Sequence, residues 1–413
     1  MKKMGKAIFK KIDFNLFDGF NLLCFCLVCG LFFSRAILSI SCVLLLLQAI
    51  YSYFKAPFKL QQSKLVIAFF FIYACYALRI LAGGENLAYG LHLLFNHALL
   101  LLLPSAFLFK RKIFSKLLYQ IGWVFIACAS LSLSILSIQV LVDFDAFVSA
   151  VEASKNVEPV IGSHHSNLNL LYVIAFGFGL VTAEKENRPW ARLLLLILLG
   201  LMFFQLHLIA FRFSVIAVYI FLALYLIRWL LISNRKSVWL ALFMVLFFAV
   251  VFSFVPSINA RYQNTVQDLK VFKQNKNPNF NSLTQRILAL DCAYKIILRH
   301  PLYGVSPTIA EQRMQEQYAL NSYLLIPENR VFVHNQFAYF LLCFGVLGGA
   351  VLALVILWLI FKQFTTKGYG WILLPFVLHM LIENTLEKQI TLAAFIFLVL
   401  IIQKHQQTIN ATN

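Results

Sequence analysis

Charged residues are scarce in this sequence, and acidic residues are the scarcest. Only 12% of the 413 residues are charged, and aspartate and glutamate together number 16. A soluble domain of ordinary composition carries roughly 25% charged residues. Hydrophobic residues make up 61% of the chain. This composition excludes an ordinary soluble protein and indicates an integral membrane protein.

A phosphate-loop motif and a pair of carboxylates within one span are also missing. The phosphate-binding pattern GxxxxGK[ST] does not occur, and no predicted span carries two carboxylates. These absences argue against a phosphate-loop ATPase and a typical proton relay. Of the eight cysteines, only Cys292 lies in a long polar segment, so no loop disulfide is expected. We interpret Cys24, Cys26 and Cys29 as packing residues of an apolar helix, and we expect no metal site and no cofactor.

Long apolar runs are present along the whole chain. Runs of about 17 to 25 residues can cross a hydrocarbon core of about 30 Å as helices. They predict an all-α polytopic membrane protein, a single integral membrane domain over residues 1–413 with about twelve transmembrane helices. The predicted spans lie near residues 15–34, 36–53, 65–83, 90–109, 118–142, 167–183, 190–209, 213–232, 238–256, 337–361, 370–386 and 389–403.

The basic residues predict how these spans are oriented. With the N-terminus uncleaved and cytoplasmic, 21 of the 35 lysines and arginines fall in inner segments and five in short outer connections. The remaining nine lie in one long outer segment, and long segments cross the membrane largely regardless of charge. We therefore expect both termini in the cytoplasm. The net charge of +19 then reflects this bias and anionic lipids, and nucleic acid is not an expected partner.

Two outer segments are large enough to carry chemistry, residues 143–166 and residues 257–336, the latter between spans 9 and 10. The second segment has helix signals of its own: Ser282 or Thr284 is expected to cap a helix that Pro301 and Gly304 end. A second amphipathic run covers residues 309–320. We expect this segment to be folded and half-sunk at the membrane interface.

Three arginines near the outer face are candidates for binding phosphate, because a guanidinium stays charged and can grip phosphate oxygens with two donors. Arg212 stands between two apolar runs, Arg286 lies near the start of the first loop helix, and Arg299 lies at its end. The alternatives are an arginine that reaches the lipid headgroups for Arg212 and a solvated helix end for Arg299.

Histidines and glutamates supply the remaining candidates. His334 precedes a long apolar run, and a histidine can take a proton from a hydroxyl nucleophile near neutral pH. Asn335 is suited to orient that ring or a sugar. Glu383 and Glu387, in IENTLEKQ, are suited to bind a sugar or to pair with arginines, and His165 belongs to a second histidine pair on the outer side. A structural role is the alternative for His334, and a place at the polar lip of a loop is the alternative for His165.

Four stretches, taken together, resemble the bacterial O-antigen ligase family and its relatives among the O-antigen polymerases. They are RFSVIAVYIFLAL from Arg212, TQRILALDCAYKIILRHPLYGV around Arg286, HNQFAYFLLCFGVLGG from His334, and IENTLEKQITLAAFIF around Glu383. In order and spacing they span most of residues 160–400, whereas the first 140 residues match only as generic spans. Arg212 departs from the pattern, because it lies in FRF without the small or polar neighbours expected there.

The resemblance implies an activity and a place for it. A GT-C-like enzyme of the bacterial inner membrane would transfer a glycan from undecaprenyl diphosphate to a sugar hydroxyl of lipid A–core, without a metal and with inversion, facing the periplasm. Arg212 and Arg286 would hold the diphosphate and His334 would activate the acceptor hydroxyl, so these three are the expected catalytic residues. The expected substrate-binding residues are Asn335, Arg299, His165, Glu383 and Glu387. Membrane lipids complete the expected partners.

Two other functions stay open. A polymerase would extend the glycan on its own undecaprenyl carrier, and the same motifs occur in polymerases. A lipid-linked oligosaccharide flippase would perform no covalent step, but it predicts basic residues in the centres of many spans, where this sequence has few. The single dominant outer segment favours the ligase over the polymerase.

Overall fold

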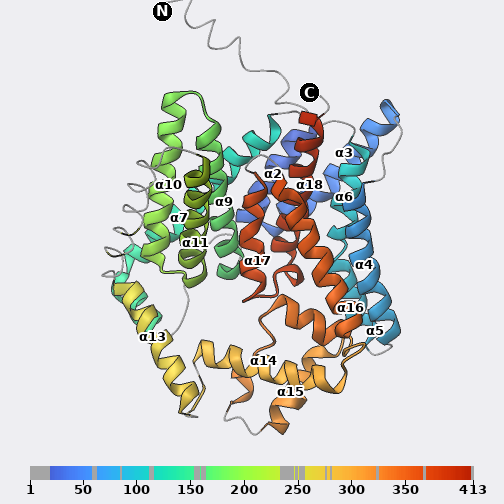
Figure 1. The fold of residues 1–413 in the computed structure, drawn as a ribbon, viewed down its shortest axis with the longest axis vertical. Coiled ribbons are helices and arrows are strands. Elements are labelled where there is room, and N and C mark those ends of the chain that lie inside the picture. The colour runs from blue at the N-terminus through green and yellow to red at the C-terminus, as the bar shows by residue number, and fades with distance from the viewer. Residues whose placement is uncertain are drawn as a thin grey trace, which may run out of the picture.

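A computed structural model describes most of the chain. The described residues are 19–57, 63–83, 86–110, 116–152, 164–232, 256–274, 277–279, 281–321, 325–365 and 369–410, with the single positions 159, 246 and 250. Within these ranges every regular element is a helix and no strand is present. The long helices run side by side as a bundle, and further helices lie at one end of it (Figure 1). We call this the loop end.

Eight described helical segments are long and apolar enough to cross a membrane. The chain is therefore a multi-pass membrane protein, as predicted. The helices that form these segments are α3 (Arg35–Lys55), α4 (Lys64–Gly83), α5 (Leu87–Asn96) with α6 (Leu99–Phe109), α7 (Leu117–Val142), α9 (His165–Lys185), α10 (Pro189–Ile209), α16 (Gln336–Phe361) and α18 (Gln389–Asn410).

Three more predicted spans correspond to shorter apolar helices. They are α2 (Gly19–Phe33), the stretch Arg212–Ile227 of α11 (Arg212–Ile232), and the pair η4 (Tyr369–Leu373) and α17 (Leu374–Met380). The predicted span 238–256 lies almost entirely outside the described residues. The count of twelve spans and their orientation across the membrane therefore stay predictions.

One predicted span contains a turn, and another ends earlier than expected. A turn at His97 and Ala98 interrupts the predicted span 90–109. Helix α17 ends at Met380, so the residues expected to complete the span 370–386 leave the helix and return as the short helix η5 (Thr385–Glu387). This early exit matters for function, because it brings Glu383 and its neighbours to the loop end of the bundle.

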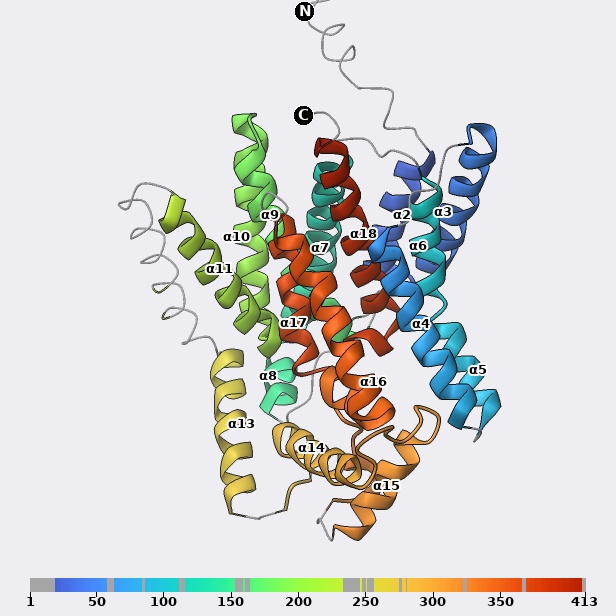
Figure 2. The same cartoon turned by 45° about the vertical axis from the view of Figure 1, so that its right-hand side comes forward.

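Two helices form the centre of the bundle. Helix α9 is buried along almost its whole length, and it packs against α7, α10 and α11. Helix α18 is buried over Ile390–Ile402, where it packs against α6 and, more lightly, α7 and α9. The last helical turn of α18 lies at the end of the bundle opposite the loop end (Figure 2).

The loop end is built from α13 (Pro256–Lys273), α14 (Ser282–Arg299), α15 (Ala310–Leu320) and η2 (Pro327–Asn329). The two predicted amphipathic helices are present as α14 and α15, and α14 ends just before Pro301 as expected. The predicted cap was wrong: the N-cap position is Asn281, and its side chain does not cap the helix. Helix α13 was not predicted, and it packs against α8 (Phe144–Glu152) from the other outer segment.

Helix α16 is broken at Gly345, which has a φ of 65°. The turn after α14 fills the break: the N–H of Val346 donates to the carbonyl of Pro301 at 2.8 Å, and the N–H of Val305 donates to Leu342 at 2.7 Å. Arg79 of α4 donates to the carbonyls of Cys343 and Gly304 at 3.0 and 2.9 Å. The glycines of HNQFAYFLLCFGVLGG thus allow close packing as expected, but their partner is this turn and the first half of α16 itself.

Candidate active site

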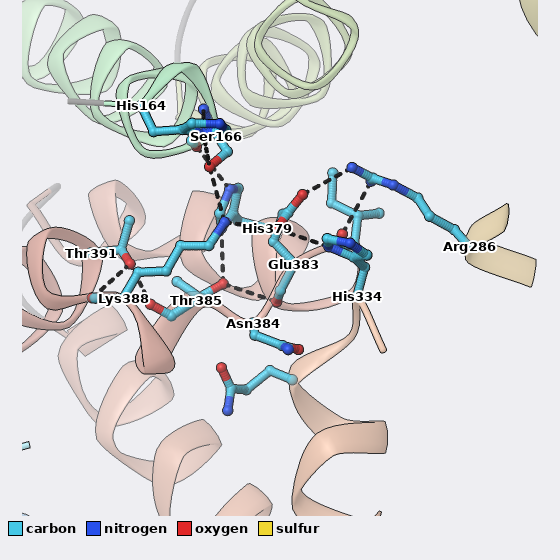
Figure 3. Close-up of polar contacts among 12 residues, drawn as sticks. His164, Ser166, Arg286, His334, His379, Glu383, Asn384, Thr385, Lys388 and Thr391 are labelled. Atoms are coloured by element: carbon cyan, nitrogen blue, oxygen red, sulfur yellow. Dashed lines mark hydrogen bonds and ion pairs between the residues drawn. The ribbon is translucent and has the colours of Figure 1, made fainter. Parts of the chain in front are cut away.

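Glu383 is the centre of a polar cluster at the loop end (Figure 3). Its side chain is only 7% exposed, and it follows the end of α17 by three residues. Oxygen Oε1 accepts a bond from Arg286 Nη2 at 2.9 Å. Oxygen Oε2 lies 3.2 Å from His334 Nδ1 and 2.8 Å from Lys388 Nζ. Three donors from three different segments therefore meet one buried carboxylate.

The charges around Glu383 keep it ionised. Burial by itself would raise the pKa of the Glu383 carboxyl, but the hydrogen bond from His334 and the positive charges of Lys388 and Arg286 outweigh burial. The net result is a pKa well below the usual range of a glutamate. An ionised carboxylate can only accept hydrogen bonds, so Nδ1 of His334 carries the proton in this contact. In a neutral ring this leaves the lone pair of Nε2 available.

The segments around the cluster are fixed by bonds to the backbone. Asn335 caps α16 by accepting from Ala338 N at 2.9 Å, and its amide donates to the carbonyl of Leu381 at 2.9 Å. Asn384 donates to the carbonyl of Val333 at 2.7 Å. These bonds join the start of α16 to the segment after α17 on both sides of His334. The histidine is 30% exposed, so it is held in place but remains accessible.

Helix α9 supports the cluster from the bundle side. Lys388 donates to Ser166 Oγ at 2.9 Å as well as to Glu383. His379 lies with Nε2 at 3.2 Å from the carbonyl of Ser166 and Nδ1 at 2.8 Å from Thr385 Oγ1. His165 stands beside Ser166 at the start of α9, and its ring is 4.0 Å from that of His164. His165 therefore lies at the edge of this cluster.

Arg212 begins α11 at the same end of the bundle. Its charge interacts with those of Asp268 and Arg286. Its Nε atom is buried, and no hydrogen-bond partner for it occurs among the described residues. Arg286 also donates to the carbonyl of Ile382 at 3.3 Å, but its side chain is 36% exposed. Two guanidinium groups thus lie near each other with donor capacity to spare, an arrangement that suits an anionic ligand.

Two predicted site residues lie apart from the cluster. Arg299 is exposed at the far end of α14, about 20 Å along the helix from Arg286 at 1.5 Å per residue. Glu387 belongs to a separate buried cluster, in which Tyr76 and Gln336 donate to Oε1 and His97 Nε2 lies 3.2 Å from Oε2. Burial would raise the pKa of the Glu387 carboxyl, but the charge of His97 leads the contributions that lower it. Substrate binding by Arg299 and by Glu387 stays a prediction.

Sequence reasoning overlooked three members of the site. Lys388 entered only the count of basic residues, although it stands in the quoted stretch IENTLEKQ. Ser166 and Asp268 carry no motif and become visible only through their partners. Within the described ranges no group of three or more His, Cys, Asp or Glu side chains is placed to hold a metal ion.

Comparison with known proteins agrees with the resemblance drawn from the motifs. Residues 193–353 match the family described as O-antigen ligase. The matched range includes Arg212, Arg286 and His334, whereas Glu383 and Lys388 lie beyond it. A search of the curated proteins found no match. The match over residues 193–353 supports the O-antigen ligase family for this part of the chain.

Proposed function

We propose that this protein is an O-antigen ligase. It would transfer a glycan from undecaprenyl diphosphate to a sugar hydroxyl of lipid A–core on the periplasmic face of the bacterial inner membrane. The observation that carries this proposal is the contact of Glu383 with both His334 and Arg286. This contact places a candidate base beside a candidate phosphate-binding group.

His334 is the proposed base. With Nδ1–H held by the Glu383 carboxylate, Nε2 faces the acceptor as a lone pair, the arrangement by which a carboxylate orients a histidine in acyl-transfer triads. The acceptor hydroxyl gives its proton to Nε2 as its oxygen bonds to the anomeric carbon. The bond from that carbon to the diphosphate oxygen breaks, and its electron pair leaves with undecaprenyl diphosphate. Attack opposite the leaving group inverts the anomeric centre.

Arg286 and Arg212 are the proposed diphosphate ligands. Negative charge grows on the diphosphate as it leaves, and fixed cations aimed at it lower the barrier. The unpartnered Nε of Arg212 and the partly exposed guanidinium of Arg286 supply donors for this purpose. Asn335, His165, Arg299 and Glu387 remain proposed substrate-binding residues, although the partners of Glu387 favour an anchoring role for it.

The test is transfer by the purified protein. Undecaprenyl diphosphate–glycan and lipid A–core are incubated with it, with and without EDTA, and both lipids are analysed on a gel. We expect the core lipid to gain the glycan in EDTA, and His334→Ala to abolish this gain while membrane insertion is retained. Longer carrier-linked chains alone would identify a polymerase. Two unchanged lipids would reject transfer and favour a flippase.

A further inference from the structure

The first turn of α14 depends on a residue from another helix. A helix leaves its first four N–H groups without internal partners. In α14 the N-cap side chain does not supply an acceptor, because the amide of Asn281 instead donates to the carbonyls of Asn277 and Asn279 at 3.3 and 3.1 Å. Arg286 lies in the helical turn that follows, so its position depends on how this end is held.

Asp268 of α13 supplies the missing contacts. Its Oδ2 accepts from the backbone N–H of Leu283 at 3.1 Å, and its carbonyl accepts from Thr284 Oγ1 at 2.9 Å. Asp268 is 1% exposed, whereas Tyr262, Leu269 and Phe272 of the same helix are 64%, 42% and 39% exposed. The best-buried contact between α13 and α14 is thus a carboxylate at a helix N-terminus, where the helix dipole favours a negative charge.

The Asp268 carboxylate also interacts electrostatically with Arg212, the candidate phosphate-binding arginine of α11. Burial raises the pKa of Asp268, and the bond from Leu283 and the charge of Arg212 oppose this shift. The positive charges of Arg212 and Arg286 repel each other. Asp268 contacts α14, which carries Arg286, and its negative charge attracts Arg212 of α11. It therefore lowers the electrostatic cost of holding the two arginines near each other.

We propose that Asp268 is a positioning residue of this enzyme: it holds the first turn of α14 on α13 and so keeps Arg286 in place beside Arg212 and Glu383. The inference rests on the proposed function for its catalytic consequence. The structural part, that Asp268 caps α14 from outside the helix, does not depend on it.

Two substitutions separate capping from general damage. Asp268→Asn keeps an oxygen that can accept from Leu283, whereas Asp268→Ala removes it. Loss of a capping oxygen shifts a local equilibrium by roughly tenfold. We expect kcat of transfer to fall by about that factor in Asp268→Ala, with KM for lipid A–core unchanged. We expect part of kcat to return in Asp268→Asn, which keeps the capping oxygen but loses the charge. Asp291→Asn, which removes the same charge from an exposed pair with Lys295 on α14, serves as the matched control.

A mutant cycle shows whether Asp268 acts through Arg286. In an Arg286→Lys background, Asp268→Ala is expected to cost less than about twofold, because coupled residues are non-additive. An undiminished loss there, or equal losses in the Asn and Ala variants, would overturn the proposal. If Asp268→Ala does not fold, Thr284→Val removes the second contact from the α14 side and takes its place.

Amide hydrogen exchange tests the cap without any substrate. Residues 282–286 are expected to exchange about tenfold faster in Asp268→Ala and near the wild-type rate in Asp268→Asn. Unchanged exchange in both variants would refute the cap. If the wild-type protein transfers no glycan, the proposed function fails, and the exchange result still decides the role of Asp268.

Discussion

Replacing Glu383 with glutamine tests the centre of the site. In the wild type, Oε1 receives Arg286, and Oε2 lies within bonding distance of both His334 and Lys388. Glutamine has one acceptor oxygen and one amide donor. Whichever way the amide is turned, its NH₂ group faces a cation or the N–H of His334. No orientation of glutamine can therefore reproduce the three contacts.

The expected cost follows from what His334 loses. If the amide oxygen stays on Arg286, the NH₂ group faces Nδ1 and favours the ring tautomer that carries its proton on Nε2, which cannot act as the base. If the oxygen faces His334 instead, Arg286 loses its acceptor and meets an NH₂ group. Positioned acid–base catalysis contributes roughly 10² to 10⁴ in rate. We expect kcat to fall by about 10³, which corresponds to about 4 kcal/mol. KM for the donor should stay level or fall, because Arg286 and Lys388 lose the anion that partly neutralises them.

The assay is steady-state transfer with purified protein in nanodiscs, in which kcat and the two KM values are measured separately. Glu316→Gln is the control, since Glu316 is 45% exposed and pairs only locally with Arg313 on α15. Glu383→Gln activity within about tenfold of the wild type would refute the tautomer argument. A loss confined to KM of the donor would also refute it and would assign Glu383 to binding alone.

Three further outcomes follow from other parts of the structure. Gly345→Ala should lower the unfolding temperature in detergent, because Gly345 has a φ of 65° and a Cβ there would meet the backbone of Leu302. An unchanged unfolding temperature would contradict the break in α16. Leu298→Trp should gain fluorescence that brominated lipids quench, since Leu298 is 60% exposed on the side of α14 that also exposes Leu290 and Tyr294. Quenching no greater than for Gln312→Trp would place α14 away from the bilayer. The low pKa of Glu383 should make the wild type more stable than Glu383→Gln at neutral pH. This difference in the free energy of unfolding is full above about pH 4.3 and shrinks as the pH falls further. A difference that grows towards acid pH in unfolding experiments would contradict the prediction.

Hydropathy and helix-breaking residues were sufficient to predict most of the helices. Apolar runs located α9, α10 and α16 to within two residues of their observed ends, and Pro301 marked the end of α14. The start of α18 was also located, but this helix continues seven residues beyond its predicted end. They failed for α13, whose sequence PSINARYQNTVQDLKVFK has no sustained apolar face. This helix is held by polar contacts instead, such as the bond from Asn264 to the carbonyl of Val151 at 2.7 Å. Such long-range contacts leave no periodic pattern in the sequence.

The site was predictable as a set of residue types and not as an arrangement. His334, Arg286 and Glu383 were singled out because a histidine can act as a base, an arginine can bind phosphate, and a glutamate can bind a sugar or pair with arginines. Their contacts could not be inferred, since they depend on α17 ending at Met380 and on the break in α16. The sequence around Gly345 indicated close packing, but it did not distinguish a close helix pair from a helix broken by an inserted turn.

The two glutamates of IENTLEKQ show how the helices of the bundle hold the site in place. Glu383 and Glu387 are four residues apart, and each binds a different set of partners. Glu387 contacts Tyr76 of α4 and Gln336 of α16, with His97 nearby, and Gln336 also accepts from Leu386 N at 2.8 Å. Removing one partner of such a buried group leaves the other charge unpaired, at a cost of several kcal/mol. The segment that carries Glu383 is therefore anchored both to α4 and His97, which lie outside the matched family range, and to α16, which begins inside it. The first 140 residues therefore support the candidate site through Tyr76 and His97, although they carry none of the proposed reacting groups.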